Sequence, residues 1–144
     1  MQVSEVMTRN VECIRPANSI VEAARHMKKI DVGALPVCGD NDRLVGMVTD
    51  RDIVLRGVAD RRDLEKAKVQ DIMTSEVEYC VEDQPVEEAA RLMRQKQIRR
   101  LVVLNNDHRL VGIVSLGDLA VDMHDEMLVG SALEGISQPA KPNR

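Results

Sequence analysis

The sequence contains two similar halves. A shift of 66 positions aligns residues 3–53 with 69–119 without a gap, and 18 of the 51 aligned pairs are identical. The longest identical runs are 22–25 with 88–91 and 43–46 with 109–112. A duplicated unit this short rarely buries its apolar face alone, so we expect the two copies to pack on each other and to form a pseudo-two-fold cleft.

The composition supports a real core and excludes several classes of protein. Hydrophobic residues make up 44% of the 144 residues, but there is no Phe or Trp, and there is one Tyr beside 8 Met. Charged residues make up 31% with a net charge of −4, which does not favour binding of DNA or RNA. No apolar run is long enough to span a membrane. The N-terminus does not resemble a secretory signal, so we expect a cytoplasmic protein.

The hydrophobic pattern predicts strand, helix, strand, strand and helix in each copy, an α/β fold. The predicted strands are 11–14, 34–38 and 44–48 in the first copy and 77–81, 101–104 and 110–114 in the second. Apolar residues recur at helical spacing from Ile20 to Met27 and from Val86 to Met93. Ser19 with Glu22 predicts a capping box. A second helix is expected from Asp50 to Arg56, ended by Gly57, and its counterpart from 116 to about 123.

These elements define the domain organisation that we expect. Residues 1–57 form the first repeat, 58–68 a polar linker and 69–123 the second repeat. The remaining tail, 124–144, is expected to extend the last helix in part and to fray from Gly135 onward, where Pro139 and Pro142 follow.

A hydroxyl and a carboxylate recur at the end of each copy. Thr49 and Ser115 follow an apolar strand, and Asp52 and Asp118 come three residues later. Both groups can have a purely structural role at a helix start: the hydroxyl as an N-cap, and the carboxylate as a favourable negative charge. The same place suits a phosphate, and a carboxylate can accept from both hydroxyls of a ribose. A glycine three residues before each hydroxyl leaves room for close approach to the backbone, so the repetition favours a binding site.

The cysteines give a weaker signal for function. Cys13, Cys38 and Cys80 have no CxxC spacing, and we interpret them as small buried hydrophobic residues rather than a disulfide framework or zinc site. Cys38 precedes Gly39-Asp40, near a turn, and is expected to be the most accessible. No nucleophile–base pair or metal cluster is evident, so we expect no catalytic activity and no required cofactor.

Taken together, these features resemble a tandem pair of CBS domains, the Bateman module, over nearly all of residues 1–123. The resemblance rests on residues 6–8 and 72–74, the Ala-Ala pairs of the helices, 33–37, 99–103 and the two Gly-h-h-[Thr/Ser]-x-x-Asp endings. Residues 32–43 and 46–53 are similar to small stand-alone bacterial proteins of the hypoxic response protein type. The resemblance implies two pseudo-symmetric repeats packed through their sheets, and clefts for AMP, ADP, ATP or S-adenosylmethionine.

In that family each cleft draws on both repeats. One cleft would combine Ser115 and Asp118 with Arg15, Ile20, Val32, Gly33 and Ala34. The other would combine Thr49 and Asp52 with Val81, Val86, Ile98, Arg99 and Arg100. Arg99 and Arg100 occupy places where the family often contacts phosphate. The alternative is an exposed basic pair at a helix-to-strand turn. Because Gly33-Ala34 replaces the Arg pair in the first copy, we expect the Thr49/Asp52 cleft to bind more tightly.

Three functions remain open. The leading hypothesis is a regulatory module that binds an adenosine-containing molecule, forms a homodimer and acts in trans on an unknown partner protein. The second is a dimeric interaction protein whose clefts stay empty, with leftover apolar helix faces driving assembly. The third is a thiol-based redox sensor. Saturable nucleotide binding separates the first from the second, and a triple Cys-to-Ser variant tests the third.

Overall fold

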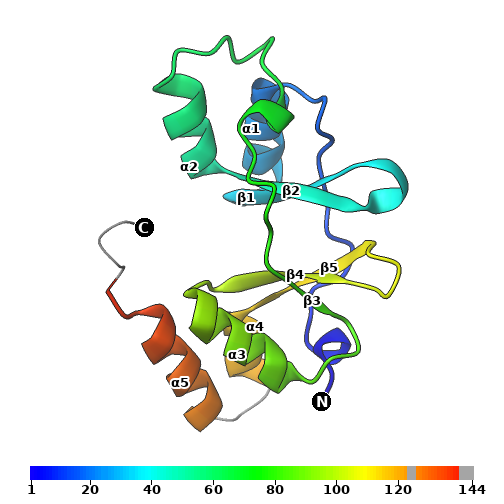
Figure 1. Cartoon of the computed structure of the whole chain (residues 1–144), viewed down its shortest axis with the longest axis vertical. Coiled ribbons are helices and arrows are strands. Elements are labelled where there is room, and N and C mark those ends of the chain that lie inside the picture. Colours follow the sequence, from blue (N-terminus) through cyan, green and yellow to red (C-terminus); the bar gives the residue numbers. More distant parts are fainter. Residues whose placement is uncertain (123–125, 140–144) are drawn as a thin grey trace. The chain divides into compact units, whose positions relative to one another are not determined.

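The computed structural model describes residues 1–122 and 126–139, which form two compact units (Figure 1). One unit comprises Met1–Val11, Glu78–Asp107 and Val111–Arg144, and we call it the C-terminal unit. The other, the N-terminal unit, comprises Glu12–Val77 and His108–Leu110. The units therefore do not coincide with the contiguous sequence repeats, because each repeat contributes its first residues to the unit built mainly from the other repeat.

The N-terminal unit contains two β-strands and several helices, most of them short. Its elements are α1 (Ile20–Ile30), β1 (Ala34–Cys38), the 3₁₀ turn η2 (Asp40–Asp42), β2 (Leu44–Thr49), α2 (Asp50–Asp52), the π-helical η3 (Ile53–Val58) and the 3₁₀ turn η4 (Val69–Asp71). β1 and β2 are antiparallel, with a register shift between Val37 and Cys38. Ile14 adds an isolated parallel bridge to Val37.

The C-terminal unit contains a three-stranded sheet in the order β3-β4-β5. Its elements are the 3₁₀ turn η1 (Val3–Glu5), β3 (Tyr79–Val81), α3 (Val86–Lys96), β4 (Arg100–Leu104), β5 (Leu110–Ser115), α4 (Leu116–Asp122) and α5 (Glu126–Ile136). β3 runs parallel to β4, with Cys80 opposite Val103. α5 packs against α3 and α4 (Figure 1).

The first helices of the two repeats form for shared local reasons. Each carries one buried stripe, which is made of Ile20, Ala23 and Met27 in α1 and of Val86, Ala89, Ala90 and Met93 in α3. The Ser19 hydroxyl accepts from the Glu22 N–H at 3.1 Å, which is the N-cap half of the predicted capping box. The other half is not formed, because the Glu22 carboxylate accepts from the Asn18 side-chain amide instead. Each helix ends at a left-handed residue that is not glycine, Asp31 or Gln97.

The exchanged N-terminal segments are held by backbone hydrogen bonds. In the C-terminal unit, Thr8 and Ile113 exchange N–H to carbonyl bonds of 2.8 and 3.0 Å. In the N-terminal unit, Met47 and Thr74 do the same, with both bonds at 2.9 Å. The linker also belongs to the N-terminal unit, because the carbonyls of Leu64 and Ala67 accept from the first N–H groups of α1. Each unit has its own apolar core.

The structure corrects several local predictions. Residues 11–13 are not a strand, and Ile14 alone forms a bridge. Gly57 does not end the second helix but lies buried inside η3, where an added Cβ would be 3.3 Å from Leu64 and 3.8 Å from Ile20. Glycine is present there because of this close packing. The tail is helical from Glu126 to Ile136. Residues 124–125 and 140–144 of the predicted tail, and residue 123 before it, lie outside the described residues.

The prediction that Cys38 is the most accessible cysteine is wrong. Cys38 is 0% exposed, because the β1 strand continues through it into the core, whereas Cys13 is half-buried. Cys80 is also buried, and its thiol donates weakly to the Val102 carbonyl at 3.9 Å.

Candidate functional site

The predicted hydroxyl and carboxylate pairs close reciprocal capping boxes in both units. The Thr49 hydroxyl accepts from the Asp52 N–H at 3.1 Å, and Asp52 Oδ2 accepts from the Thr49 N–H at 3.0 Å. The Ser115 hydroxyl accepts from the Asp118 N–H at 3.1 Å, and Asp118 Oδ2 accepts from the Ser115 N–H at 2.8 Å. The structural interpretation of these residues is therefore correct, and each helix start is rigidly held.

Capping uses only one oxygen atom of each carboxylate. Neither Asp52 nor Asp118 shows a hydrogen-bond partner for Oδ1 within the part of the chain that is described, and both residues are half-buried. A carboxylate has about four lone-pair sites for hydrogen bonds. The same side chain can thus close the cap with one oxygen and accept hydroxyl groups of a ligand with the other.

A second segment is fixed beside each capping box. The Gly33 carbonyl accepts from the Asp50 N–H at 2.9 Å, and the Arg99 carbonyl accepts from the Leu116 N–H at 2.9 Å. The structure therefore brings Val32, Gly33 and Ala34 together with Thr49 and Asp52, and it brings Ile98, Arg99 and Arg100 together with Ser115 and Asp118. The two groupings of the sequence analysis, which join residues across the units, stay predictions.

The segments beside the two capping boxes differ in charge. An added Cβ at Gly33 would lie 2.9 Å from Asp50 Oδ2, so the Asp50 carboxylate occupies the space that a side chain would need. At the matching positions the C-terminal unit has Arg99 and Leu116. Arg99 and Arg100 are exposed, and neither guanidinium forms an ion pair with any described residue. The basic edge thus remains available to an anion, whereas the first repeat presents an acidic one.

The remaining predicted contacts divide into surface and core. Val81 is half-buried, so it offers some surface. Ile20 is 0% exposed and Val86 is 1% exposed, so both serve the cores and offer no surface to a ligand in this structure. Arg15 donates to the carbonyls of Cys38, at 3.3 Å, and of Gly39, and lies 3.8 Å from Asp42. Its guanidinium therefore holds the turn after β1.

The strand glycines have a different role from the predicted one. An added Cβ at Gly46 would lie 2.7 Å from Met73 Sδ and 2.9 Å from the Thr74 carbonyl oxygen. At Gly112 it would lie 2.7 Å from both Met7 Sδ and the Thr8 carbonyl oxygen. The close approach that we inferred is thus made by the exchanged segment of the chain itself. The identity of 7–8 with 73–74 was the sequence signal for this contact.

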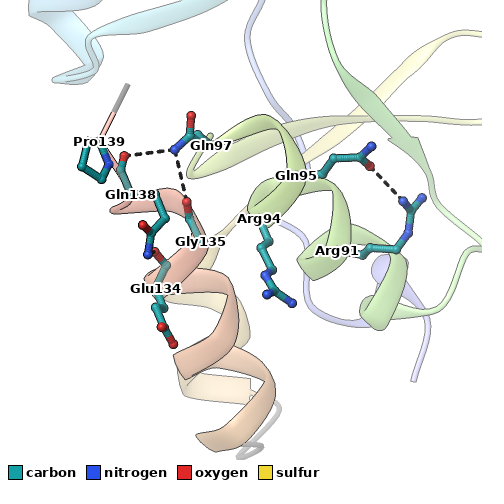
Figure 2. A pocket seen from close by; sticks show the side chains of 8 residues that line it. All are labelled: Arg91, Arg94, Gln95, Gln97, Glu134, Gly135, Gln138 and Pro139. Carbon is teal, nitrogen blue, oxygen red and sulfur yellow. Dashed lines mark hydrogen bonds between the residues drawn. The ribbon is translucent and has the colours of Figure 1, made fainter. Parts of the chain in front are cut away.

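A groove of about 670 Å³ lies between α3 and α5, and none of the predicted site residues lines it (Figure 2). Sequence reasoning missed it because the partners lie far apart in the chain. The Gln97 amide donates to the carbonyls of Gly135, at 3.3 Å, and of Gln138, at 3.0 Å, and so ties the end of α5 to the end of α3. Arg91 is already engaged by Glu88 at 2.9 Å. We interpret the groove as the polar margin of this helix contact.

No group of three or more His, Cys, Asp or Glu side chains is placed to hold a metal ion among residues 1–122 and 126–139. Over the same residues, none of the helices combines the length and apolarity that crossing a bilayer requires.

Comparison with known proteins identifies relatives that match most of the chain. The "Hypoxic response protein 1" of Mycobacterium tuberculosis is 37% identical over 125 residues, covering 87% of each chain. The "CBS domain-containing protein YhcV" of Bacillus subtilis is 44% identical over 135 residues, covering 94% of each chain.

The chain is also similar to several solved structures. Hypoxic Response Protein I, with two coordinated zinc ions, has a TM-score of 0.77 at 37% identity and covers 85% of this chain and 98% of its own. The CBS domain protein PAE2072 of Pyrobaculum aerophilum, complexed with AMP, has a TM-score of 0.76 at 30% identity and covers 91% of this chain and 99% of its own. CBSX2 in complex with AMP has a TM-score of 0.71 at 29% identity and covers 92% and 96%.

The family model described as CBS domain matches twice, at residues 3–59 and 69–125. Each match includes the exchanged segment at its start and the capping box near its end. The two copies seen in the sequence are therefore two CBS domains, and the chain belongs to the CBS-domain family.

Proposed function

We propose that this chain is a non-catalytic regulatory module that binds an adenosine-containing molecule such as AMP, ADP, ATP or S-adenosylmethionine. The observation that carries the proposal is the pair of capping boxes, in which Asp52 and Asp118 each keep one carboxylate oxygen without a partner among the described residues. An oxygen held in this way suits the vicinal hydroxyls of a ribose. The AMP complexes of PAE2072 and CBSX2 support the choice of ligand.

Phosphate recognition in this proposal falls to the basic edge. Arg99 and Arg100 are exposed and form no ion pair with a described residue. A guanidinium presents paired donors that match a phosphate group. Apolar surface would cover the base, from Val81 and Ile98 in the Thr49/Asp52 site and from Val32 in the Ser115/Asp118 site, because the chain has no Phe or Trp for stacking. We keep Thr49 and Asp52 with Arg99 and Arg100 as the tighter of the two sites.

Regulation requires that the ligand prefers one state of the protein. A ligand that binds two states equally shifts no equilibrium, however tightly it binds. We propose that the bound state is recognised by a separate partner protein, so that the chain acts in trans.

We also infer that the protein is a homodimer assembled through the N-terminal unit. η3 contacts α1 and exposes Val54, Leu55 and Val58, while Ala24 of α1 is exposed as well. Lysine at both Val54 and Val58 should convert the dimer to a monomer in sedimentation velocity. Lysine at Met127 of α5, which is 87% exposed, is the matched control and should leave the dimer intact. A wild-type protein that sediments as a monomer would remove this part of the proposal.

The ligand is tested by thermal unfolding with AMP, ADP, ATP, NAD or S-adenosylmethionine, with and without magnesium. Ligand at about 100 times its Kd stabilises the fold by about 2.7 kcal/mol, which raises Tm by a few degrees. We expect Asp52→Ala to abolish this rise. Asp71→Ala is the control, because Asp71 accepts from the Lys68 N–H at 2.9 Å with the same spacing but lies outside the proposed site.

The outcomes separate the candidate functions. A rise that survives Asp71→Ala but not Asp52→Ala supports the nucleotide site. Loss of the rise only in Asp118→Ala would reverse our ranking of the two sites. If no nucleotide stabilises a well-folded sample, the chain is better described as an assembly protein with empty clefts.

A further inference from the structure

The end of α3 and the residues that follow it form a strongly basic stretch. Residues 91–100 contain five Lys or Arg and no Asp or Glu. Two of these cations are paired with acids from earlier in the chain, since Arg91 lies 2.9 Å from Glu88 and Lys96 lies 3.6 Å from Glu78. Cations at the end of a helix also stabilise the helix itself, so the stretch alone does not indicate a binding site.

Arg94 differs from these paired residues. Its guanidinium forms neither a hydrogen bond nor an ion pair with any described residue. Its stem, however, is held by packing, because a Cβ added at Gly135 of α5 would lie 3.2 Å from both Cβ and Cδ of Arg94 and closer still to Cγ. Gly135 thus leaves the space through which the stem passes. The unpaired guanidinium is therefore directed to the groove between α3 and α5 (Figure 2).

The rest of the groove offers groups that suit a peptide backbone. Side-chain amides of Gln95, Gln97 and Gln138 line it. Gln95 accepts from Arg91 at 3.0 Å with its oxygen, which leaves its NH2 group for another acceptor. Gln97 donates its NH2 group to the carbonyls of residues 135 and 138, which leaves its oxygen to accept. The volume of about 670 Å³ lies within the range of sites that hold molecules of drug size.

We propose that this groove docks an extended, acidic segment of the partner protein, with a carboxylate of that segment bound to Arg94. A guanidinium binds a carboxylate through two parallel hydrogen bonds, and arginine is enriched in protein interfaces. Holding the stem in place lowers the entropy that docking costs. Glu134 is the one acid that lines the groove, and it limits how far the acidic part of the segment extends.

The groove is next to the basic edge that we assign to the ligand. Gln97 lines the groove and ends α3, and Ile98 and Arg99 follow it directly. A change at residues 98–100 can therefore reach the groove through its own wall. The inference rests on the proposed action in trans, for which it names the chemistry of the partner, but docking itself does not require a nucleotide.

The test is a titration of the full-length, ¹⁵N-labelled protein, without nucleotide, followed by NMR. The probe is an acetylated and amidated hexapeptide of alternating Ser and Glu, and its control has Gln in place of Glu. The Glu peptide should shift the backbone amides of residues 91–97 and 134–138 in a saturable way, and the Gln peptide should not. Inorganic phosphate is the third probe, because a small anion could also bind a guanidinium.

Variants of the groove should change this binding in opposite directions. Arg94→Gln should weaken it by about tenfold or more, and Arg94→Lys by less, because it keeps the charge but loses the paired donors. Glu134→Gln should strengthen it, because it removes the acid that repels the probe. Lys28→Gln is the matched control, since Lys28 is the counterpart of Arg94 in the first repeat and should have no effect.

The proposal is overturned if the Glu peptide shifts no amide of the groove in folded wild type, or if Arg94→Gln binds it as tightly as wild type. Equal binding of the Gln peptide would also overturn it. Phosphate that binds as tightly as the Glu peptide would replace the docking surface with a small-anion site. Arg94→Gln should keep the rise in Tm with nucleotide, so failure of docking is distinguishable from failure of the nucleotide site.

Discussion

Ala24 and Ala90 occupy the same place in two helices that share the sequence Glu-Ala-Ala-Arg, yet Ala24 is exposed and Ala90 is 1% exposed. The difference comes from α5, which packs on α3 and has no counterpart after η3. Alanine at this position serves close helix packing in one unit and leaves a shallow surface in the other. A duplicated sequence therefore gives two similar folds with different surfaces, and the open surface is where we place the dimer contact.

The largest expected effect tests this difference directly. Lysine at position 90 would place a charged side chain under α5 and should lower the free energy of unfolding by about 3 kcal/mol or more. Lysine at position 24 should change it by about 0.5 kcal/mol or less. Urea unfolding of both variants measures the two values. Equal losses would mean that α5 does not cover α3 in solution.

The strand glycines test where the two units are alike. Gly112→Ala and Gly46→Ala should each destabilise the protein by about 1–3 kcal/mol, because the new Cβ would meet a backbone carbonyl that cannot move aside. Gly117→Ala is the control, since its Cβ would lie 3.6 Å from Ser115 Oγ, an ordinary contact. It should be neutral or stabilising by up to about 1 kcal/mol. Chemical unfolding at one temperature compares all three.

Each unit also contains a buried thiol that affects stability in alkali. Burial raises the pKa of Cys80 to about 11, and burial together with Cys13 and Asp42 raises that of Cys38 to about 12, from an ordinary value of 9.0. Below pH 9 both thiols are protonated whether folded or unfolded. Above it the unfolded chain ionises first, so stability falls as pH rises toward 11 and 12.

The expected loss is up to about 1.4 kcal/mol for each pH unit and each thiol. Urea unfolding of the reduced protein between pH 8 and 10.5 measures it. Cys80→Ala and Cys38→Ala should each flatten the slope relative to wild type. An unchanged slope in either variant would show that the thiol ionises freely in the folded protein.

The smallest effect concerns the ends of α1 and α3. Asp31 and Gln97 both have left-handed backbone angles, with φ of 57° and 56°. Asp31→Gly should therefore stabilise the protein by about 1 kcal/mol. Gln97→Gly should gain less or nothing, because it also removes the two hydrogen bonds to the carbonyls of Gly135 and Gln138. A thermal melt of each variant, run beside wild type, tests the ranking.

Local patterns predicted much of the fold. The helices at Ile20 and Val86, the hairpin strands and the Ser19 cap follow from periodicity and capping chemistry within about ten residues. The same reasoning predicted the N-caps at Thr49 and Ser115, but it did not predict that Asp52 and Asp118 close the boxes, and it could not choose between a structural role and a ligand contact. Residues 11–13 were predicted as a strand and are not one, because pairing depends on a partner that the sequence does not identify.

The chain's own sequence determined the duplication, the two helix–strand patterns and the Thr49/Asp52 and Ser115/Asp118 boxes, since these depend on neighbours along the chain. The tertiary structure alone decided which unit each N-terminal segment joins, which segment approaches the backbone at Gly46 and Gly112, and that Ile20 and Val86 leave no surface for a ligand. These features depend on contacts between residues distant in sequence, and burial and close packing, rather than local preference, select them.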